Sequence, residues 1–256
     1  MPYLVTAIAL ALAVTVPSLA KATPTPRLIG ANGQGTLLFI GDSLTVGADA
    51  FGSLATRTRD TYMWTKVIMD ARVGRTASTG ATTLRTRRTA HTTAIVVALG
   101  TNDMISKSES WYPSWVIDKV MTQSRGVPVL WFNLEFSATS RGDWRARASR
   151  FNRSLRLAQV KWPNLTIADW NSHFVPNRVS RFIADGVHLT VNGYRTRASF
   201  SVKQLLQFGD VIVNASTTTT STTTTSTSTS STSSSTTSTT STTTTTTTTP
   251  PSPPST

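Results

Sequence analysis

The chain has 256 residues, a formal net charge of +13 from 25 Lys and Arg against 12 Asp and Glu, and no cysteine. The lack of cysteine excludes a disulfide scaffold, a thiolate zinc site and a cysteine nucleophile. No apolar run of ~18 residues follows the N-terminal segment, which excludes a multi-span membrane protein. Most apolar residues lie between positions 23 and 214, a length that suits one globular domain with a sizeable core.

The first 22 residues have the pattern of a cleavable secretory signal. Residues 4–16 are almost wholly apolar, and small residues precede two candidate cleavage points, after Ala20 and after Ala22. The first three residues carry no Lys or Arg, so an uncleaved anchor or a buried helix is the alternative. We expect residues 1–22 to be a signal peptide, the mature chain to have no transmembrane span, and the protein to be secreted or held at the cell surface.

The C-terminus is an unbroken run of 34 Ser and Thr residues at positions 216–249, followed by a Pro-rich end. Such a segment has no apolar surface to offset the entropy lost on ordering, so we expect it to be disordered. Its hydroxyl density suits an O-glycosylated spacer, and a plain flexible tail is the alternative. The expected organisation is a signal peptide, a linker, one domain and a tail, at residues 1–22, 23–34, 35–214 and 215–256.

Between the two ends, short apolar runs alternate with helical patterns. These runs are continuous rather than alternating with polar residues, which is typical of strands covered on both faces. The clearest helix spans residues 144–160 with Asp143 as N-cap, and a last helix is expected to end at Gly209. The alternation predicts an α/β fold, a three-layer α/β/α sandwich around a mostly parallel sheet of about five strands. The expected strands are residues 36–40, 66–69, 94–99, 127–132 and 165–168.

Chemically useful residues follow the predicted strands. Ser43 comes after the first strand, Gly74 after the second and Asn102 after the third, whereas Asp185 and His188 come after the fifth. In open parallel sheets, sites form beyond the carboxyl ends of the strands. We therefore expect all five residues at one edge of one sheet.

These residue types suit nucleophilic catalysis by a serine. The hydroxyl of Ser43 needs a base to take its proton, and the imidazole of His188 suits that role. Asp185 lies three residues before His188, so its carboxylate can reach and orient the same imidazole. The Asn102 side chain and the backbone N–H groups of Ser43 and Gly74 could stabilise an oxyanion. Alone, Ser43 would be interpreted as a helix N-cap and His188 as a structural histidine, but their combination favours catalysis without a cofactor or metal.

Four short blocks in this order resemble the SGNH (GDSL-type) hydrolases. The blocks are Gly-Asp-Ser-Leu at 41–44, Gly74, Gly-Thr-Asn-Asp at 100–103 and Asp-Gly-Val-His at 185–188. The serine lacks the second glycine of the G-x-S-x-G elbow found in α/β-hydrolases. All four blocks in order are a specific pattern, whereas any one of them is not.

The resemblance implies a flavodoxin-like α/β/α fold and a role for each matched residue. Ser43 would be the nucleophile, His188 the base and Asp185 its partner, with Ser43, Gly74 and Asn102 forming the oxyanion hole. The family includes esterases, lipases, polysaccharide deacetylases and some acyltransferases. The resemblance therefore indicates the reaction type more closely than the substrate.

We expect an exported serine esterase or deacylase that hydrolyses short-chain acyl esters, such as O-acetyl groups, of carbohydrate or other small acyl donors. Acyl transfer to a sugar hydroxyl is one alternative, and a non-catalytic wall-binding domain on a Ser/Thr stalk is another. The basic charge favours an acidic cell-envelope polymer as partner. Nucleic acid is disfavoured, because the sequence shows no interleaving of aromatic and basic residues.

Four further polar residues have simpler interpretations than catalysis. His91 precedes the third strand and His173 is expected in a loop, and neither has a second ligand at metal spacing. Asp42 is expected to hold the serine loop as a turn residue. Asp103 is expected to cap the helix that follows Asn102.

Tryptophans and arginines complete the set of candidate residues. Trp111 and Trp115 follow the Asn102 block closely, and one of them is a candidate for the rim of the substrate pocket. Trp144 lies on the apolar stripe of its helix and is expected in the core. The opposite side of that helix is expected to be a solvated face, formed by Arg145, Arg150, Arg153 and Arg156.

Overall fold

The computed structural model describes residues 29–30, 34–174 and 178–223, and the contacts divide the chain into Met1–Ser216 and Thr217–Thr256. The description below concerns the first unit. The predicted signal peptide, most of the predicted linker and positions 224–256 of the tail lie outside the described residues. Among the described helices, none combines the length and apolar character needed to cross a membrane.

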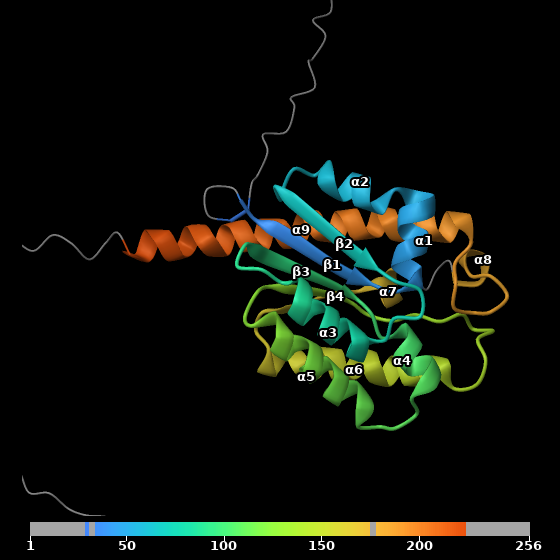
Figure 1. Ribbon diagram of the computed structural model, residues 1–256. Coiled ribbons are helices and arrows are strands. Elements are labelled where there is room, and N and C mark those ends of the chain that lie inside the picture. The colour runs from blue at the N-terminus through green and yellow to red at the C-terminus, as the bar shows by residue number, and fades with distance from the viewer. Residues whose placement is uncertain (1–28, 31–33, 175–177, 224–256) are drawn as a thin grey trace, which may run out of the picture. The chain divides into compact units, whose positions relative to one another are not determined.

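The domain is built on a five-stranded sheet in which every pair of neighbouring strands is parallel (Figure 1). The strand order β2-β1-β3-β4-β5 is that of flavodoxin-like folds, which confirms the predicted fold class. All five predicted strands are present, with ends shifted by at most two residues. The strands are β1 (Thr36–Gly41), β2 (Lys66–Ala71), β3 (Thr92–Ala98), β4 (Val129–Phe132) and β5 (Leu165–Ala168).

Helices cover both faces of the sheet (Figure 1). Leu37 and Phe39 of β1 point into one core, with residues of α1, α2, α7 and α9, whereas Leu38 and Ile40 point into the other, with α3, α5 and α6. Because each strand has an apolar layer on both sides, its sequence is a continuous apolar run. The helices are α1 (Ser43–Gly52), α2 (Leu54–Arg59), α3 (Ala77–Arg87), α4 (Thr101–Ser106), α5 (Tyr112–Ser124), α6 (Trp144–Lys161), α7 (Trp170–Phe174), α8 (Arg178–Arg181) and α9 (Val191–Thr223).

The predicted helix over 144–160 is α6, one residue longer than expected. Asp143 occupies its N-cap position, but its side chain makes no cap hydrogen bond and instead pairs with Arg147 at 2.7 Å. Trp144 packs at the edge of the core against Phe136, as expected. Of the predicted solvated face, Arg145, Arg153 and Arg156 are exposed, whereas Arg150 is half-buried.

Two details of the predicted secondary structure are wrong. The last helix does not end at Gly209 but continues to Thr223, across the expected domain boundary. Gly209 lies where a Cβ atom would clash with the side chain of Met63, so the glycine permits close packing instead of ending the helix. His173 lies in the short helix α7 and not in a loop, and its ring packs 4.6 Å from that of Phe200.

Candidate active site

The carboxyl ends of β1, β2 and β3 meet where the strand order reverses, which is the usual ligand site of such sheets. Ser43 is the first residue of α1, immediately after β1, and Gly74 lies in the turn after β2. Asn102 lies in the first turn of α4, after β3. His188 comes from the loop that precedes α9, and its side chain reaches Ser43 across 145 positions of sequence.

The structure brings Ser43, His188 and Asp185 into one hydrogen-bonded line. His188 Nε2 lies 3.0 Å from Ser43 Oγ, and His188 Nδ1 lies 2.7 Å from Asp185 Oδ2. A carboxylate on Nδ1 favours the tautomer that carries its proton there, which leaves Nε2 free to accept from the hydroxyl. The arrangement can therefore transfer the serine proton to the imidazole.

Asp185 is fixed by its own loop. Its Oδ1 accepts hydrogen bonds from the backbone N–H groups of Val187 at 2.8 Å and His188 at 2.9 Å. Partial burial acts to raise the pKa of Asp185, but the bonds from the His188 side chain and the two amides lower it below its ordinary value. The His188 and Asp185 side chains are 39% and 43% exposed, so this pair orients the imidazole more than it stabilises the fold.

The three predicted oxyanion donors lie on neighbouring segments of the same edge. Ser43 is the first residue of α1, so its backbone N–H has no carbonyl acceptor within the helix and can donate to a bound group. Gly74 adopts a φ of +75°, which a residue with a side chain would adopt only with strain. The Asn102 Nδ2 donates one hydrogen bond to the carbonyl of Arg75 at 3.0 Å, which leaves its second N–H for another acceptor.

The serine loop is held by Asp42, as the sequence predicted. Asp42 is the N-cap of α1, and its Oδ1 accepts from the N–H of Leu44 at 3.0 Å. The side chain is almost fully buried. Burial raises the pKa of Asp42 from 3.8 to about 6, although the positive charge of Arg197 acts to lower it.

Arg197 is a residue that the sequence analysis missed. It lies in α9 and is only 4% exposed, and its guanidinium sits 4.9 Å from the Trp170 ring centroid and 5.5 Å from that of Phe132. Burial lowers its pKa from 12.5 to about 10. Its spacing of three residues from the buried Tyr194 places it on the apolar face of the helix, which is the one signal that could have identified it.

Asp103 does not cap the helix after Asn102, so that prediction is wrong. Asp103 lies within the first turn of α4, and its carboxylate points across to α3 instead. Its Oδ2 accepts from the N–H of Ala77, the first residue of α3, at 2.7 Å. Its Oδ1 accepts from the hydroxyl of Tyr112, the first residue of α5, at 2.7 Å. Burial raises the pKa of Asp103. The result is a buried link that fixes α4, and with it Asn102, beside the start of α3.

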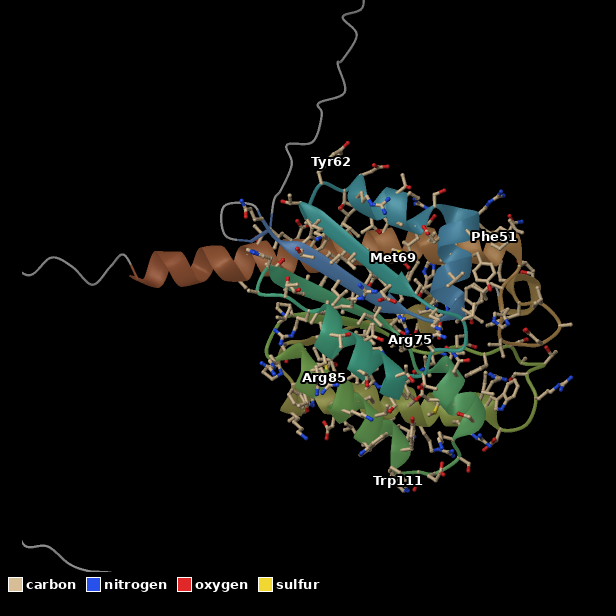
Figure 2. All side chains as sticks on the ribbon, in the orientation of Figure 1. Phe51, Tyr62, Met69, Arg75, Arg85 and Trp111 are labelled. Carbon is tan, nitrogen blue, oxygen red and sulfur yellow. The ribbon has the colours of Figure 1, made fainter. Side chains whose placement is uncertain are left out.

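The remaining candidate residues lie on the surface. Trp111 is 60% exposed and Trp115 is 44% exposed, and their rings meet edge to face at 6.1 Å. Figure 2 shows Trp111 at the outer edge of the domain. A role for either ring at the rim of a substrate pocket stays a prediction. Within the described ranges, no three His, Asp or Glu side chains come together in the way that a metal site requires.

Sequence comparison identifies the family. Residues 39–196 match the model of the GDSL-like Lipase/Acylhydrolase family, and the matched region contains all the predicted site residues. The chain therefore belongs to this family, which confirms the resemblance of its four sequence blocks to the SGNH (GDSL-type) hydrolases. No curated protein sequence matches the chain.

Three solved structures illustrate the fold that the chain shares. The C-terminal catalytic domain of Streptococcus pneumoniae peptidoglycan O-acetyltransferase A is 20% identical with a TM-score of 0.53, covering 69% of this chain and 95% of that one. TesA is 17% identical with a TM-score of 0.55, covering 68% and 99%. The lipase/acylhydrolase from Enterococcus faecalis is 17% identical with a TM-score of 0.56, covering 67% and 95%. At these identities the likeness concerns the fold.

Proposed function

We propose that this chain is a serine esterase or deacylase that works through an acyl-enzyme formed on Ser43. The observation that carries the proposal is the line from Ser43 Oγ to His188 Nε2 at 3.0 Å and from His188 Nδ1 to Asp185 at 2.7 Å. Its place at the switch point of the sheet, in a family of acylhydrolases, supports the same assignment.

In the first half of the reaction, Ser43 Oγ attacks the carbonyl carbon of the ester while His188 Nε2 accepts the serine proton. The tetrahedral intermediate carries a negative charge on the former carbonyl oxygen. The N–H groups of Ser43 and Gly74 and the free N–H of the Asn102 side chain donate to that charge. The imidazolium then gives its proton to the departing alkoxide, and the acyl group stays on Ser43.

In the second half, His188 takes a proton from water, and the resulting hydroxide attacks the acyl-enzyme. Collapse of the second intermediate releases the carboxylic acid and returns the proton to Ser43. Acyl transfer is the second candidate, in which a sugar hydroxyl takes the place of water. The likeness in fold to the S. pneumoniae peptidoglycan O-acetyltransferase domain supports acyl transfer as this second candidate.

The preferred substrates are short-chain esters such as O-acetyl groups on carbohydrate, in an acidic polymer of the cell envelope. The net charge of +13 supports an acidic partner, and the signal-like N-terminus and the Ser/Thr tail support export. Secretion is testable on its own, because mass spectrometry of protein from the medium should find a mature N-terminus at Lys21 or Thr23.

The test of the enzyme assignment is labelling with an organophosphonate together with hydrolysis of p-nitrophenyl esters of increasing chain length. The wild-type chain should be labelled once, at Ser43, because only a hydroxyl whose proton a base can accept reacts with such a probe. Ser43→Ala should abolish labelling and turnover, and His188→Ala should nearly do so. Asp185→Asn should keep weak activity. The matched control is His91→Ala, which removes an exposed histidine and should change neither.

One outcome would refute the assignment. If the folded wild-type chain is neither labelled nor active on any short-chain ester, the domain is a wall-binding module and not an enzyme. If it is active, adding a soluble chito-oligosaccharide distinguishes the two reactions. Hydrolysis releases acetate alone, whereas transfer yields an acetylated oligosaccharide that mass spectrometry detects.

A further inference from the structure

One arginine contacts all three segments that carry the oxyanion donors. Arg75 follows Gly74 directly, and its side chain is only 6% exposed. Figure 2 shows it at the end of the sheet where β1 and β2 terminate, beside the start of α3. Its Nη2 donates to Asp70 Oδ1 at 2.6 Å, and its Nη1 donates to the backbone carbonyls of Asp70 and, at 3.3 Å, of Gly41.

Three links of Arg75 lie close to the three donors. Gly41 is two residues before Ser43, so the bond to its carbonyl ties the guanidinium to the serine loop. Gly74 is the chain neighbour of Arg75. The Arg75 carbonyl accepts from Asn102 Nδ2 at 3.0 Å, which sets the direction of the remaining N–H of that amide. Through its side chain and its backbone, Arg75 thus joins the segments of Ser43, Gly74 and Asn102.

The turn at Gly74 is held by a small number of bonds, and the Arg75 side chain supplies part of them. The φ of Gly74 is +75°, and a Cβ atom built there would have no neighbour within 4 Å, so the turn lies in open space. The Arg75 N–H donates to the carbonyl of Arg72 at 3.2 Å, and the Arg72 N–H donates to the carbonyl of Gly41 at 3.1 Å. The buried guanidinium donates to that same Gly41 carbonyl and so adds a second link between the turn and the serine loop. Asp70 keeps the guanidinium in place. Partial burial acts to raise the pKa of that carboxyl, but the hydrogen bonds and charges of Arg75 and Arg87 lower it.

We propose that Arg75 is a positioning residue that fixes the three oxyanion donors relative to one another. In the part of the chain that the structure describes, its guanidinium bonds Asp70 and the Gly41 carbonyl and none of Ser43, Asp185 and His188, so it acts through the geometry of the donors. Oxyanion stabilisation depends on donors that are already in place before charge develops, and small displacements weaken it. This inference rests on the proposed function, because it concerns the transition state of the same reaction.

The test is a comparison of two arginines that share one partner. Arg87 also bonds Asp70, with its Nε 3.0 Å from Oδ2, but its side chain is 61% exposed, and among the described residues no hydrogen bond joins it to Gly41, Gly74 or Asn102. In the full chain, Arg75→Met should lower kcat on p-nitrophenyl acetate by ~10–10²-fold with KM changed by less than about 2-fold. Arg75→Lys should lower kcat as well, because an ammonium cannot donate in the same fork. Arg87→Met should leave both constants close to wild type.

A double variant separates positioning from a general loss of stability. If Arg75 acts by aligning the donors, then the loss of kcat in Arg75→Met combined with Asn102→Ala should be clearly smaller than the two single losses multiplied together, because part of the effect of Arg75 is exerted through Asn102. A fully additive loss would overturn the proposal, as would Arg75→Met and Arg75→Lys kinetics that match those of Arg87→Met. If thermal unfolding shows that Arg75→Met does not fold, the kinetics of Arg75→Lys and Asp70→Asn are compared with those of Arg87→Met instead. Asp70→Asn is expected to lower kcat and to leave KM unchanged.

The experiment also separates this inference from the proposed function. A wild-type chain without labelling or turnover would refute the proposed function itself. A wild-type chain that is active, with Arg75 variants as active as the control, would leave the function standing and refute only the role of Arg75.

Discussion

The buried carboxyl of Asp42 should make the domain less stable as pH rises from 4 to 7. Burial raises the pKa of Asp42 from 3.8 to about 6, so the folded state binds this proton more tightly than the unfolded state does. The contribution to the free energy of unfolding is therefore complete below about pH 4 and is lost as pH rises through about 6. A difference of about two pKa units corresponds to ~3 kcal/mol.

The measurement is urea unfolding of the wild-type chain and of Asp42→Asn at several values between pH 4 and pH 7. Asparagine keeps the side-chain oxygen that caps α1 through the N–H of Leu44, but it cannot titrate. The unfolding free energy of the variant minus that of wild type should therefore grow by ~2 kcal/mol across this range, the greater part of the full linkage energy. Taking the difference cancels the titrations that both chains share.

Asp118 provides a control of opposite sign. Partial burial acts to raise its pKa, but hydrogen bonds from Lys161 and Trp162 lower it below its ordinary value. The contribution of Asp118 to the unfolding free energy is present above its unfolded pKa and is lost in acid. The unfolding free energy of Asp118→Asn minus that of wild type should therefore fall, or stay level, as pH rises. A flat difference for Asp42→Asn would refute the argument from burial. A difference that falls with pH would mean that the attraction of Arg197 outweighs the cost of burying the carboxylate.

Two further predictions concern the oxyanion site and the tail. Asn102→Ala should lower kcat on a soluble ester by ~10²–10³-fold with little change in KM, because in the proposed mechanism its amide donates to charge that exists only in the transition state. Steady-state kinetics measure both constants, and an effect confined to KM would instead indicate substrate positioning. Removal of residues 217–256, which form a separate unit by their contacts, should leave the melting temperature and kcat almost unchanged in a thermal-unfolding and ester-hydrolysis comparison, and a large loss of either would mean that the tail packs on the domain.

The sheet was predictable because its signal is local. Each strand is a continuous apolar run, and the pattern follows from the helices that cover both faces. The rule that sites form beyond the carboxyl ends of parallel strands then places Ser43, Asn102 and His188 at one edge from the sequence alone. The prediction needed only the order of elements along the chain.

The partners of single side chains were less predictable, because they depend on packing between distant segments. Asp103 was expected to cap its own helix, yet its carboxylate bonds Ala77, which lies 26 positions away in α3. Gly209 was expected to end a helix, because glycine is common at that position. Its actual reason is the close approach of Met63 from another part of the domain, which no local pattern encodes.

The arginines show most clearly why a site is harder to predict than a fold. Charge is ordinarily found at the surface, so an excess of 25 Lys and Arg over 12 Asp and Glu was attributed to solvated faces and an acidic partner. Two of those cations are instead buried beside the segment that precedes Ser43. Arg75 donates to the carbonyl of Gly41, and the charge of Arg197 acts on the carboxyl of Asp42. A buried guanidinium is costly unless it is hydrogen-bonded or paired, and Arg75 offsets that cost with its bonds to Asp70 and to the Gly41 carbonyl. In this chain, part of the positive charge is therefore buried beside the serine loop, where no pattern local to Arg75 would place it.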